Sequence, residues 1–229
     1  MLLGNKPIGT IAYLGGVLSL PEEFCWNWGQ MIQYNTEYMC NPGEYIHYTR
    51  AKASYHAFAR NELVKEIQGD WLLMLDIDHS FEPDLALRLR YRMDKYNIDV
   101  LTGLYLYKYP PHSPVLYQYS KDGIPQPLVD WTEGADIFEV NAAGAGVLMI
   151  KRKVFDRIKE ELKEEPFDIK PPFGEDHSFF KRLEDLNIKT YCCPVVESHH
   201  LGLKKYSYDE DYDKTFFEKR EGNKVGGFI

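Results

Sequence analysis

The stretch that decides the fold is GDWLLMLDIDHSFEPD, residues 69–84. Within it, residues 71–78 form an apolar run, which predicts a buried strand of a mostly parallel sheet. Asp76 and Asp78 stand at the carboxyl end of this run and are separated by Ile77. Because side chains alternate along a strand, we expect both carboxylates on one face, with Cα atoms about 6–7 Å apart.

These two acids, a DxD motif, predict a divalent metal site. Two like charges at the end of a buried strand repel each other and are costly to desolvate unless a cation joins them. Carboxylate oxygens are the ligands that Mg²⁺ and Mn²⁺ prefer. The carboxyl edge of the strands is also where open α/β sheets bind ligands. The alternative is that one Asp caps the following helix and the other pairs with a lysine.

Strands and helices alternate through the first half of the chain. Apolar patterns predict strands at 8–14, 44–49, 71–78 and 99–107, and helices at 21–35, 51–68 and 83–96. This order predicts a parallel sheet covered by helices on both faces. We expect Ser19 to cap the first helix, and Leu85, Leu89 and Met93 to form the buried stripe of the third.

The second half of the chain is less regular. A hairpin is expected over 115–129, around Asp122-Gly123. The remaining elements are a Gly-rich strand and a second strand with two helices between them, at 142–150, 153–162, 175–187 and 189–196. We expect a single domain over residues 1–203 and a charged surface tail over 204–229.

Composition narrows the class of protein. The chain is 44% hydrophobic and 27% charged, as a globular protein is, and its net charge of −8 argues against a nucleic-acid partner. Adjacent Cys192 and Cys193 and the absence of a CxxC motif favour a reduced, cytoplasmic protein. The apolar run at 8–20 lacks the flanks of a signal peptide and is interpreted as a strand and loop, and no stretch is long enough to span a membrane.

Six segments occur in the order typical of one enzyme family. They are ARN (59–61), GDWLLMLDID (69–78), EPD (82–84), GAGVLMIKRKVFDRI (144–158), FGEDHSFFKRLEDLNIKTYCCP (173–194) and HHLG (199–202). Over roughly residues 8–202 the chain therefore resembles the family 2 glycosyltransferases. The resemblance implies the GT-A fold, a Rossmann-like, mostly parallel central sheet flanked by helices with a smaller antiparallel acceptor-side portion. Residues 1–108 would form the half that binds the nucleotide-sugar, and residues 109–203 the acceptor and catalytic half.

The resemblance also implies an activity. It is a metal-dependent transferase of the hexosyltransferase type, which moves a sugar from a UDP- or GDP-sugar to a sugar, lipid or protein acceptor, with inversion. Asp78 would coordinate Mn²⁺ or Mg²⁺, and Asp76 would lie near the donor's ribose and the metal. Asp176 matches the general base of the family. A metal that bridges the donor's diphosphate explains how an acidic protein binds an anionic substrate.

The residues around Asp176 support an inward position. Asp176, Phe180 and Leu183 fall on one stripe of the predicted helix, so Asp176 begins its apolar face. The alternative is that an acid in the first turn only complements the helix dipole. Glu175 lies about 100° away around the helix and is expected to be solvated or to support the base.

Histidines supply further candidates. The family places a metal-binding histidine after the last strand, and His200 fits that pattern better than His199, although the duplication leaves the choice open. His177 adjoins the predicted base and is a candidate contact for donor phosphate or acceptor; the alternative is an exposed helix residue. The other histidines show no pattern that indicates a role, and they are His47, His56, His79 and His112.

Five more residues are candidate donor or sugar contacts. Gly144 and Gly146 interrupt a strand, where glycine permits close approach of a ligand or tight packing against a neighbouring strand. Arg60 and Asn61 resemble the family's segment near the nucleotide; the alternative is a solvated helix surface. Trp131 is a candidate for stacking on a sugar ring, or a core residue.

Two rival functions remain open. A sugar-phosphate nucleotidyltransferase would need a Gly-rich loop with an arginine after the first strand, and AYLGGVLSLP (12–21) lacks the arginine. A non-catalytic sugar-binding module on the same fold is the other rival. The second strand ends YTRAKAS (48–54), where the family usually has an acid that contacts the base, so the donor base stays open.

Overall fold

The computed structural model describes residues 6–15, 19–52, 55–128, 130–131, 134–202 and 205–206. The predicted tail over 204–229 lies outside this part of the chain, apart from the short strand at 205–206. None of the helices in the described residues is long and apolar enough to cross a membrane.

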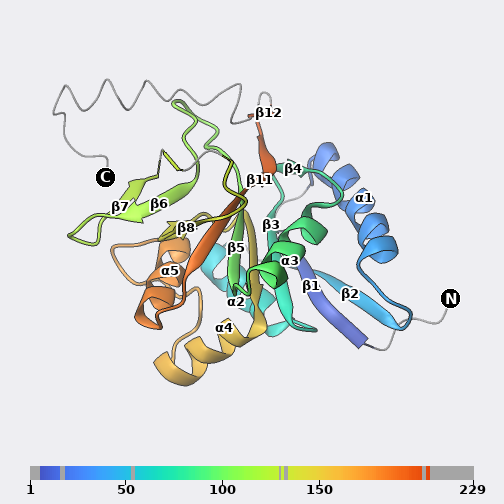
Figure 1. Ribbon diagram of the computed structural model, residues 1–229, viewed down its shortest axis with the longest axis horizontal. Coiled ribbons are helices and arrows are strands. Elements are labelled where there is room, and N and C mark those ends of the chain that lie inside the picture. Colours follow the sequence, from blue (N-terminus) through green and yellow to red (C-terminus); the bar gives the residue numbers. More distant parts are fainter. Residues whose placement is uncertain are drawn as a thin grey trace.

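Helices and strands alternate as predicted (Figure 1). The helices are α1 (Glu22–Tyr38), α2 (His56–Lys65), α3 (Leu85–Lys95), α4 (Arg152–Arg157) and α5 (Glu175–Asp185), with a π-helical segment η1 (Ile158–Leu162) after α4. The first six strands are β1 (Lys6–Leu14), β2 (Glu44–Ala51), β3 (Trp71–Asp76), β4 (His79–Phe81), β5 (Val100–Leu104) and β6 (Leu116–Tyr119). The others are β7 (Pro125–Pro127), β8 (Phe138–Val140), β9 (Ala142–Ala143), β10 (Val147–Lys151), β11 (Thr190–Leu201) and β12 (Lys205–Tyr206).

The predicted mostly parallel sheet is confirmed. A nine-stranded sheet has the order β12-β11-β5-β10-β3-β1-β2, with β4 and β8 added at β11. β1 is parallel to β2 and β3, and β5 is parallel to β11, whereas β10 runs antiparallel between β3 and β5. The hairpin expected around Asp122-Gly123 is also confirmed, because β6 and β7 pair there and form a small antiparallel sheet with β9.

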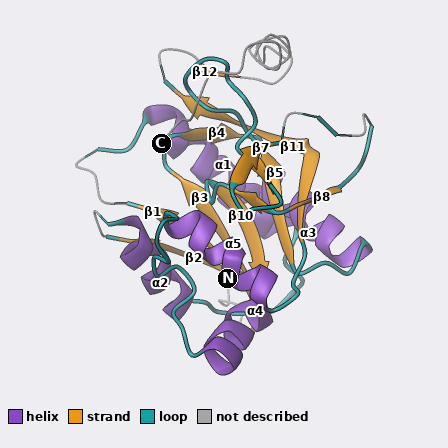
Figure 2. Cartoon of the chain, turned by 90° about the vertical axis from the view of Figure 1, so that its left-hand side faces the viewer, coloured by secondary structure: helices purple, strands orange, loops and turns teal. Residues whose placement is uncertain are grey.

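Alternating side chains of the central strand form two cores, one on each face of the sheet. On β3, Leu72 and Met74 pack into the core that α2, α4 and α5 cover. Trp71, Leu73 and Leu75 pack into the opposite core, which α1 and α3 cover. Figure 2 shows α2, α4 and α5 gathered on one side of the strands. Because helices cover both faces of the sheet, we expect the ligand-binding site at the edge where the strands end.

The helix starts differ from the sequence expectation by at most two residues, except in α2, where the difference is larger. α2 begins at His56 rather than at residue 51, because Arg50 and Ala51 continue β2 in register with β1. Ser19 does not cap α1, since Pro21 occupies the N-cap position and no side chain makes the capping hydrogen bond. The buried stripe of α3 is as predicted, with Leu85, Leu89 and Met93 at most 1% exposed.

The prediction that Asp76 and Asp78 share one strand face is wrong. β3 ends at Asp76, and Ile77 and Asp78 form a turn that leads into β4. β4 pairs antiparallel with the end of β11, and the Asp78 carbonyl accepts a hydrogen bond of 2.6 Å from the Leu201 amide. Strand β3 thus ends before Asp78, because the extended end of β11 offers hydrogen-bond partners to the residues that follow.

A close approach between β1 and β3 gives a stability prediction. A Cβ atom at Gly9 would lie 2.0 Å from a ring carbon of Trp71, which is 1% exposed. We expect Gly9→Ala to lower the free energy of unfolding by about 1–3 kcal/mol, because the fully packed indole has little room to move. Urea denaturation measures the change.

Gly29 provides the matched control. It lies inside α1, and nothing stands within 4 Å of its would-be Cβ atom. Gly29→Ala is expected to raise the free energy of unfolding by up to about 1 kcal/mol, since alanine favours a helix interior. Equal effects of the two substitutions would contradict the packing at Gly9.

Candidate active site

The predicted site residues come together where β3 ends. A cavity of about 230 Å³ there is lined by Asp76 and Asp176 and by His177 and His200, with aromatic walls from Tyr105, Tyr107 and Tyr117. These residues come from β3, α5 and β11 and from the segment that runs from the end of β5 into β6. A larger hollow of about 740 Å³ beside the start of α1 is lined by none of the predicted site residues.

Asp78, His79 and His200 form a group that can hold a metal ion. Each offers one ligand atom, and these atoms lie within 4.8 Å of one another. His79 and His200 are opposite each other in the β4–β11 pair, so their rings lie on one side, with centroids 4.3 Å apart. One carboxylate and two imidazoles suit Mn²⁺ and other first-row metals better than Mg²⁺.

The two imidazoles are oriented by their second nitrogens. The Nδ1–H of His200 donates to the Leu106 carbonyl, which can only accept, so Nε2 of the neutral ring keeps its lone pair. His79 Nδ1 lies 2.9 Å from Ser198 Oγ, and its buried Nε2 has no hydrogen-bond partner among the described residues. Outer partners of this kind fix metal-binding histidines. The residues present therefore fit a metal.

Burial keeps His79 uncharged. Its side chain is 0% exposed, and desolvation, together with the neighbouring His200, lowers the pKa of His79 to about 3. The imidazole is thus neutral at ordinary pH, which a metal ligand must be. An unpaired buried nitrogen is costly unless something binds it.

Asp78 uses its two oxygens differently. Oδ2 accepts a hydrogen bond from Lys108 Nζ, and Oδ1 lies 4.0 Å from His79 Nε2. Burial acts to raise the pKa of Asp78, but the hydrogen bond from Lys108 and the nearby His79 outweigh it, and the pKa lies below its usual value. Asp78 is therefore a carboxylate across the working pH range.

The structure distinguishes the two late histidines. His200 points to the metal-ligand group, whereas His199 pairs with Ser80 in the ladder and lies 3.6 Å from a Glu197 oxygen. His79 was missed by the sequence analysis. The sequence does show that His79 follows Asp78 directly. However, His79 reaches the ligand group only because the three-residue strand β4 pairs with β11.

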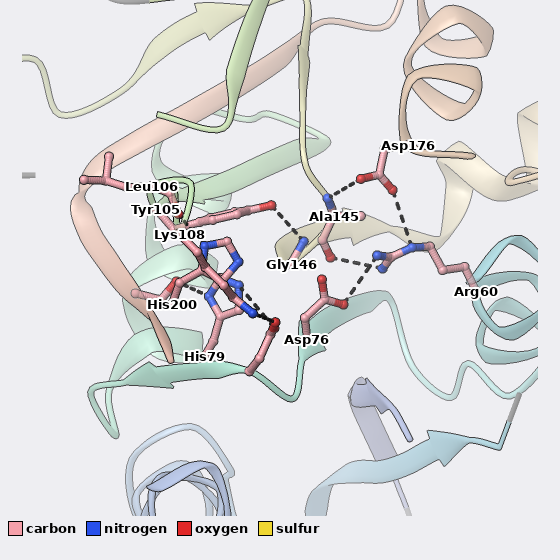
Figure 3. Close-up of polar contacts among 12 residues, drawn as sticks. Arg60, Asp76, His79, Tyr105, Leu106, Lys108, Ala145, Gly146, Asp176 and His200 are labelled. Carbon is pink, nitrogen blue, oxygen red and sulfur yellow. Dashed lines mark hydrogen bonds and ion pairs between the residues drawn. The ribbon is translucent and has the colours of Figure 1, made fainter. Parts of the chain in front are cut away.

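Arg60 is a buried partner of the acids rather than a solvated helix residue. Its side chain is 3% exposed, and its guanidinium lies 3.4 Å from Asp76, 3.5 Å from Asp176 and 3.9 Å from Glu175. It also donates a hydrogen bond of 3.1 Å to the Ala145 carbonyl. Figure 3 shows Arg60 on one side of Asp76 and the two histidines, His79 and His200, on the other. Its charge compensates acids on two separate elements.

Asp176 has the environment of a general base. Its Oδ2 accepts a hydrogen bond of 3.2 Å from the Ala145 amide, and its side chain is 29% exposed. Desolvation raises the pKa of Asp176 to about 6, although Arg60 acts to lower it. The predicted inward stripe is present, since Phe180 and Leu183 are each 1% exposed. Glu175 stands beside Asp176 and lies 3.5 Å from the exposed His56.

The glycines make room for side chains of the site itself. A Cβ atom at Gly146 would lie 2.9 Å from His79 Nε2 and 3.2 Å from Asp76 Oδ2. At Gly144 it would lie 2.1 Å from the Tyr105 hydroxyl, which accepts a hydrogen bond from the Gly146 amide. Both glycines therefore allow strand residues to pack closely under the cavity.

His177 lies on the cavity wall rather than on an exposed helix face. Its ring packs edge-on against Tyr117, with centroids 4.5 Å apart, and burial lowers its pKa. Its buried Nδ1 has no hydrogen-bond partner in the part of the chain that the structure describes.

Two predicted contacts lie outside this arrangement. Asn61 is buried, and its amide bonds to Asp168 at 2.9 Å and to the Phe167 amide at 2.9 Å, so it fastens the 167–168 segment to α2. Trp131 stacks on Phe138, with centroids 5.1 Å apart, and packs against a core. Neither side chain lines the cavity.

Comparisons with known proteins bear on the fold and on the family resemblance. Residues 32–134 match the glycosyl transferase family 2 profile. The crystal structure of A197 from STIV superposes with a TM-score of 0.52 at 22% identity, covering 84% of this chain and 85% of that one. GalNAc-T7 with UDP, GalNAc and Mn²⁺ gives a TM-score of 0.55 at 12% identity, covering 86% of this chain but 44% of that one. No curated protein matches the chain. The expected GT-A fold and the resemblance to family 2 are thus confirmed.

The metal-ligand group gives a binding prediction. We expect His79→Ala and His200→Ala each to weaken Mn²⁺ binding about tenfold or more, because each removes one of three ligands. His199→Ala is the control and should leave binding unchanged. Electron paramagnetic resonance titration of free Mn²⁺ measures the affinity. A larger loss in His199→Ala than in His200→Ala would overturn the assignment.

Proposed function

We propose that this chain transfers a hexose from a UDP- or GDP-sugar to an acceptor hydroxyl, with inversion and with the help of Mn²⁺. The match of residues 32–134 to the glycosyl transferase family 2 profile supports this proposal. The observation that carries the proposal is the pairing of a base with a metal-ligand group. Asp176 lines the same cavity as Asp76 and His200, and Asp78 and His79 complete the ligand group. A sugar donor held by its diphosphate at the ligand group would extend toward Asp176.

Asp176 is the base of the proposed reaction. Its carboxylate accepts the proton of the acceptor hydroxyl while the hydroxyl oxygen attacks the anomeric carbon. The bond from that carbon to the nucleoside diphosphate breaks, and its electron pair leaves with the phosphate oxygen. Attack from the face opposite the leaving group inverts the anomeric configuration. A pKa of about 6 matches this task, because the carboxylate is ionised near neutral pH and still basic enough to take a proton.

Asp78, His79 and His200 would hold the ion, preferably Mn²⁺ because of the two imidazoles. When bound, a divalent ion neutralises charge on the departing diphosphate. Asp76 would orient the donor near its ribose, and its bond to Arg60 fixes the carboxylate in place. Fixed charges of this kind need no rearrangement during the reaction, which is their advantage over water.

Removal of the base tests the proposal. We expect Asp176→Asn to bind UDP as the native chain does and to lose about 10²–10⁴-fold in turnover, because the amide cannot accept the proton. The measurement is nucleoside diphosphate release from a panel of UDP- and GDP-sugars with Mn²⁺ and simple sugar acceptors. The control is Asp185→Asn on the same helix, an exposed acid paired with Lys170, which should keep full turnover.

The same assay separates the rival functions. Release of pyrophosphate in place of nucleoside diphosphate would indicate a nucleotidyltransferase. Sugar binding without turnover of any donor would indicate a binding module. Full turnover in Asp176→Asn would remove Asp176 from the mechanism.

The pH profile gives an independent prediction. The reaction needs ionised Asp176, so turnover should fall as pH drops through about 6 and stay level above it. Initial rates at saturating donor and Mn²⁺ between pH 5 and 8 would show this limb. A flat profile over that range contradicts an Asp176 base.

A further inference from the structure

Lys108 reaches the site from the segment between β5 and β6. Its ammonium donates to Asp78 Oδ2, while the other oxygen, Oδ1, lies on the side of His79. A carboxylate offers about four lone-pair positions on its two oxygens. A lysine and a metal ion can therefore share Asp78 through opposite oxygens.

The backbone around Lys108 is held in place on both sides. Tyr107 N donates to Ser113 O at 3.0 Å, and Leu106 forms a β-bridge with Pro114. Leu106 is fully buried, and its carbonyl accepts the bond from His200. The segment that positions Lys108 thus also orients one of the candidate metal ligands. Figure 3 shows the Lys108 side chain beside Tyr105 and His200.

The charges around Asp78 leave a role for this ammonium. His79 and His200 are candidate ligands of the ion itself, and Arg60 is already matched to its own acids on the far side of Asp76. A divalent ion bound to the Asp78 carboxylate would keep a net charge of about +1. The diphosphate of a sugar nucleotide carries two ionised phosphates, so one negative charge is left without a partner. Lys108, 30% exposed and next to the ion's ligand, supplies the missing positive charge.

We propose that Lys108 is a second, protein-borne cation of the diphosphate site, which shares Asp78 with the bound ion and pairs with the donor's phosphates. This inference rests on the proposed function. As the bond to the anomeric carbon breaks, its electron pair adds a further negative charge to the diphosphate, and the ammonium stabilises that charge without giving up its proton. A lysine suits this position because its flexible stem lets the ammonium follow the phosphates.

The test measures binding in the full chain with three probes: Mn²⁺ alone, UDP or GDP with Mn²⁺, and UDP or GDP in EDTA. In Lys108→Met, nucleoside diphosphate affinity with Mn²⁺ should fall about tenfold or more, and affinity for Mn²⁺ alone should stay equal or rise, since a neighbouring positive charge is gone. The affinity for UDP or GDP in EDTA should fall as well. Lys108→Arg keeps the charge and should recover part of the loss.

Lys189→Met is the matched control, because Lys189, just before β11, is an exposed lysine paired with an acid, Glu139 of β8. Equal nucleoside diphosphate affinity in Lys108→Met and the native chain would overturn the inference. So would a loss fully explained by weaker Mn²⁺ binding, because Lys108 would then act only on the ion site. If the native chain binds neither Mn²⁺ nor UDP or GDP, the proposed function itself fails. If it binds them and Lys108→Met binds them equally, only the role of Lys108 fails.

Discussion

The arrangement of the site depends on one buried cation, Arg60. It reaches from α2 to Asp76 at the end of β3, to Asp176 at the start of α5 and to the Ala145 carbonyl before β10. Three acids in a partly dry site would repel one another without it. Because the same guanidinium contacts both carboxylates, it links Asp76 on β3 to Asp176 on α5. The resemblance predicts that Arg60 lies near the nucleotide, and the structure places its charge beside the three acids Asp76, Glu175 and Asp176.

The pairing of β4 with β11 is the second requirement. A three-residue strand brings His79 opposite His200, and the turn before it carries Asp78. In the proposed reaction, a bound ion with Lys108 beside it would let an acidic chain bind an anionic donor without a basic groove. The sheet holds the three candidate ligands in place because each is on or beside a paired strand.

Much of this architecture follows from sequence patterns. The alternation of apolar strands and amphipathic helices predicted the mostly parallel sheet, and the hairpin at Asp122-Gly123 followed from its turn residues. Local patterns could not show that the chain turns at Ile77, because the hydrogen bonds that stop β3 come from β11, more than a hundred residues later. For the same reason the sequence pattern indicated no role for His79 or Lys108. Asn61 was assigned to the donor by resemblance, but its amide is engaged with Asp168.

The segment from Tyr105 to Val115 contributes both to the cavity wall and to the contacts of two candidate metal ligands. Tyr105, Tyr107 and Val115 are part of the cavity wall, and between them Leu106 and Lys108 contact His200 and Asp78. In the proposed reaction, replacing that segment would disturb the candidate ion site together with the cavity wall, because the same few residues contribute to both. Substitutions at His177 on α5 would alter the wall without removing the contacts that Lys108 and Leu106 make with Asp78 and His200.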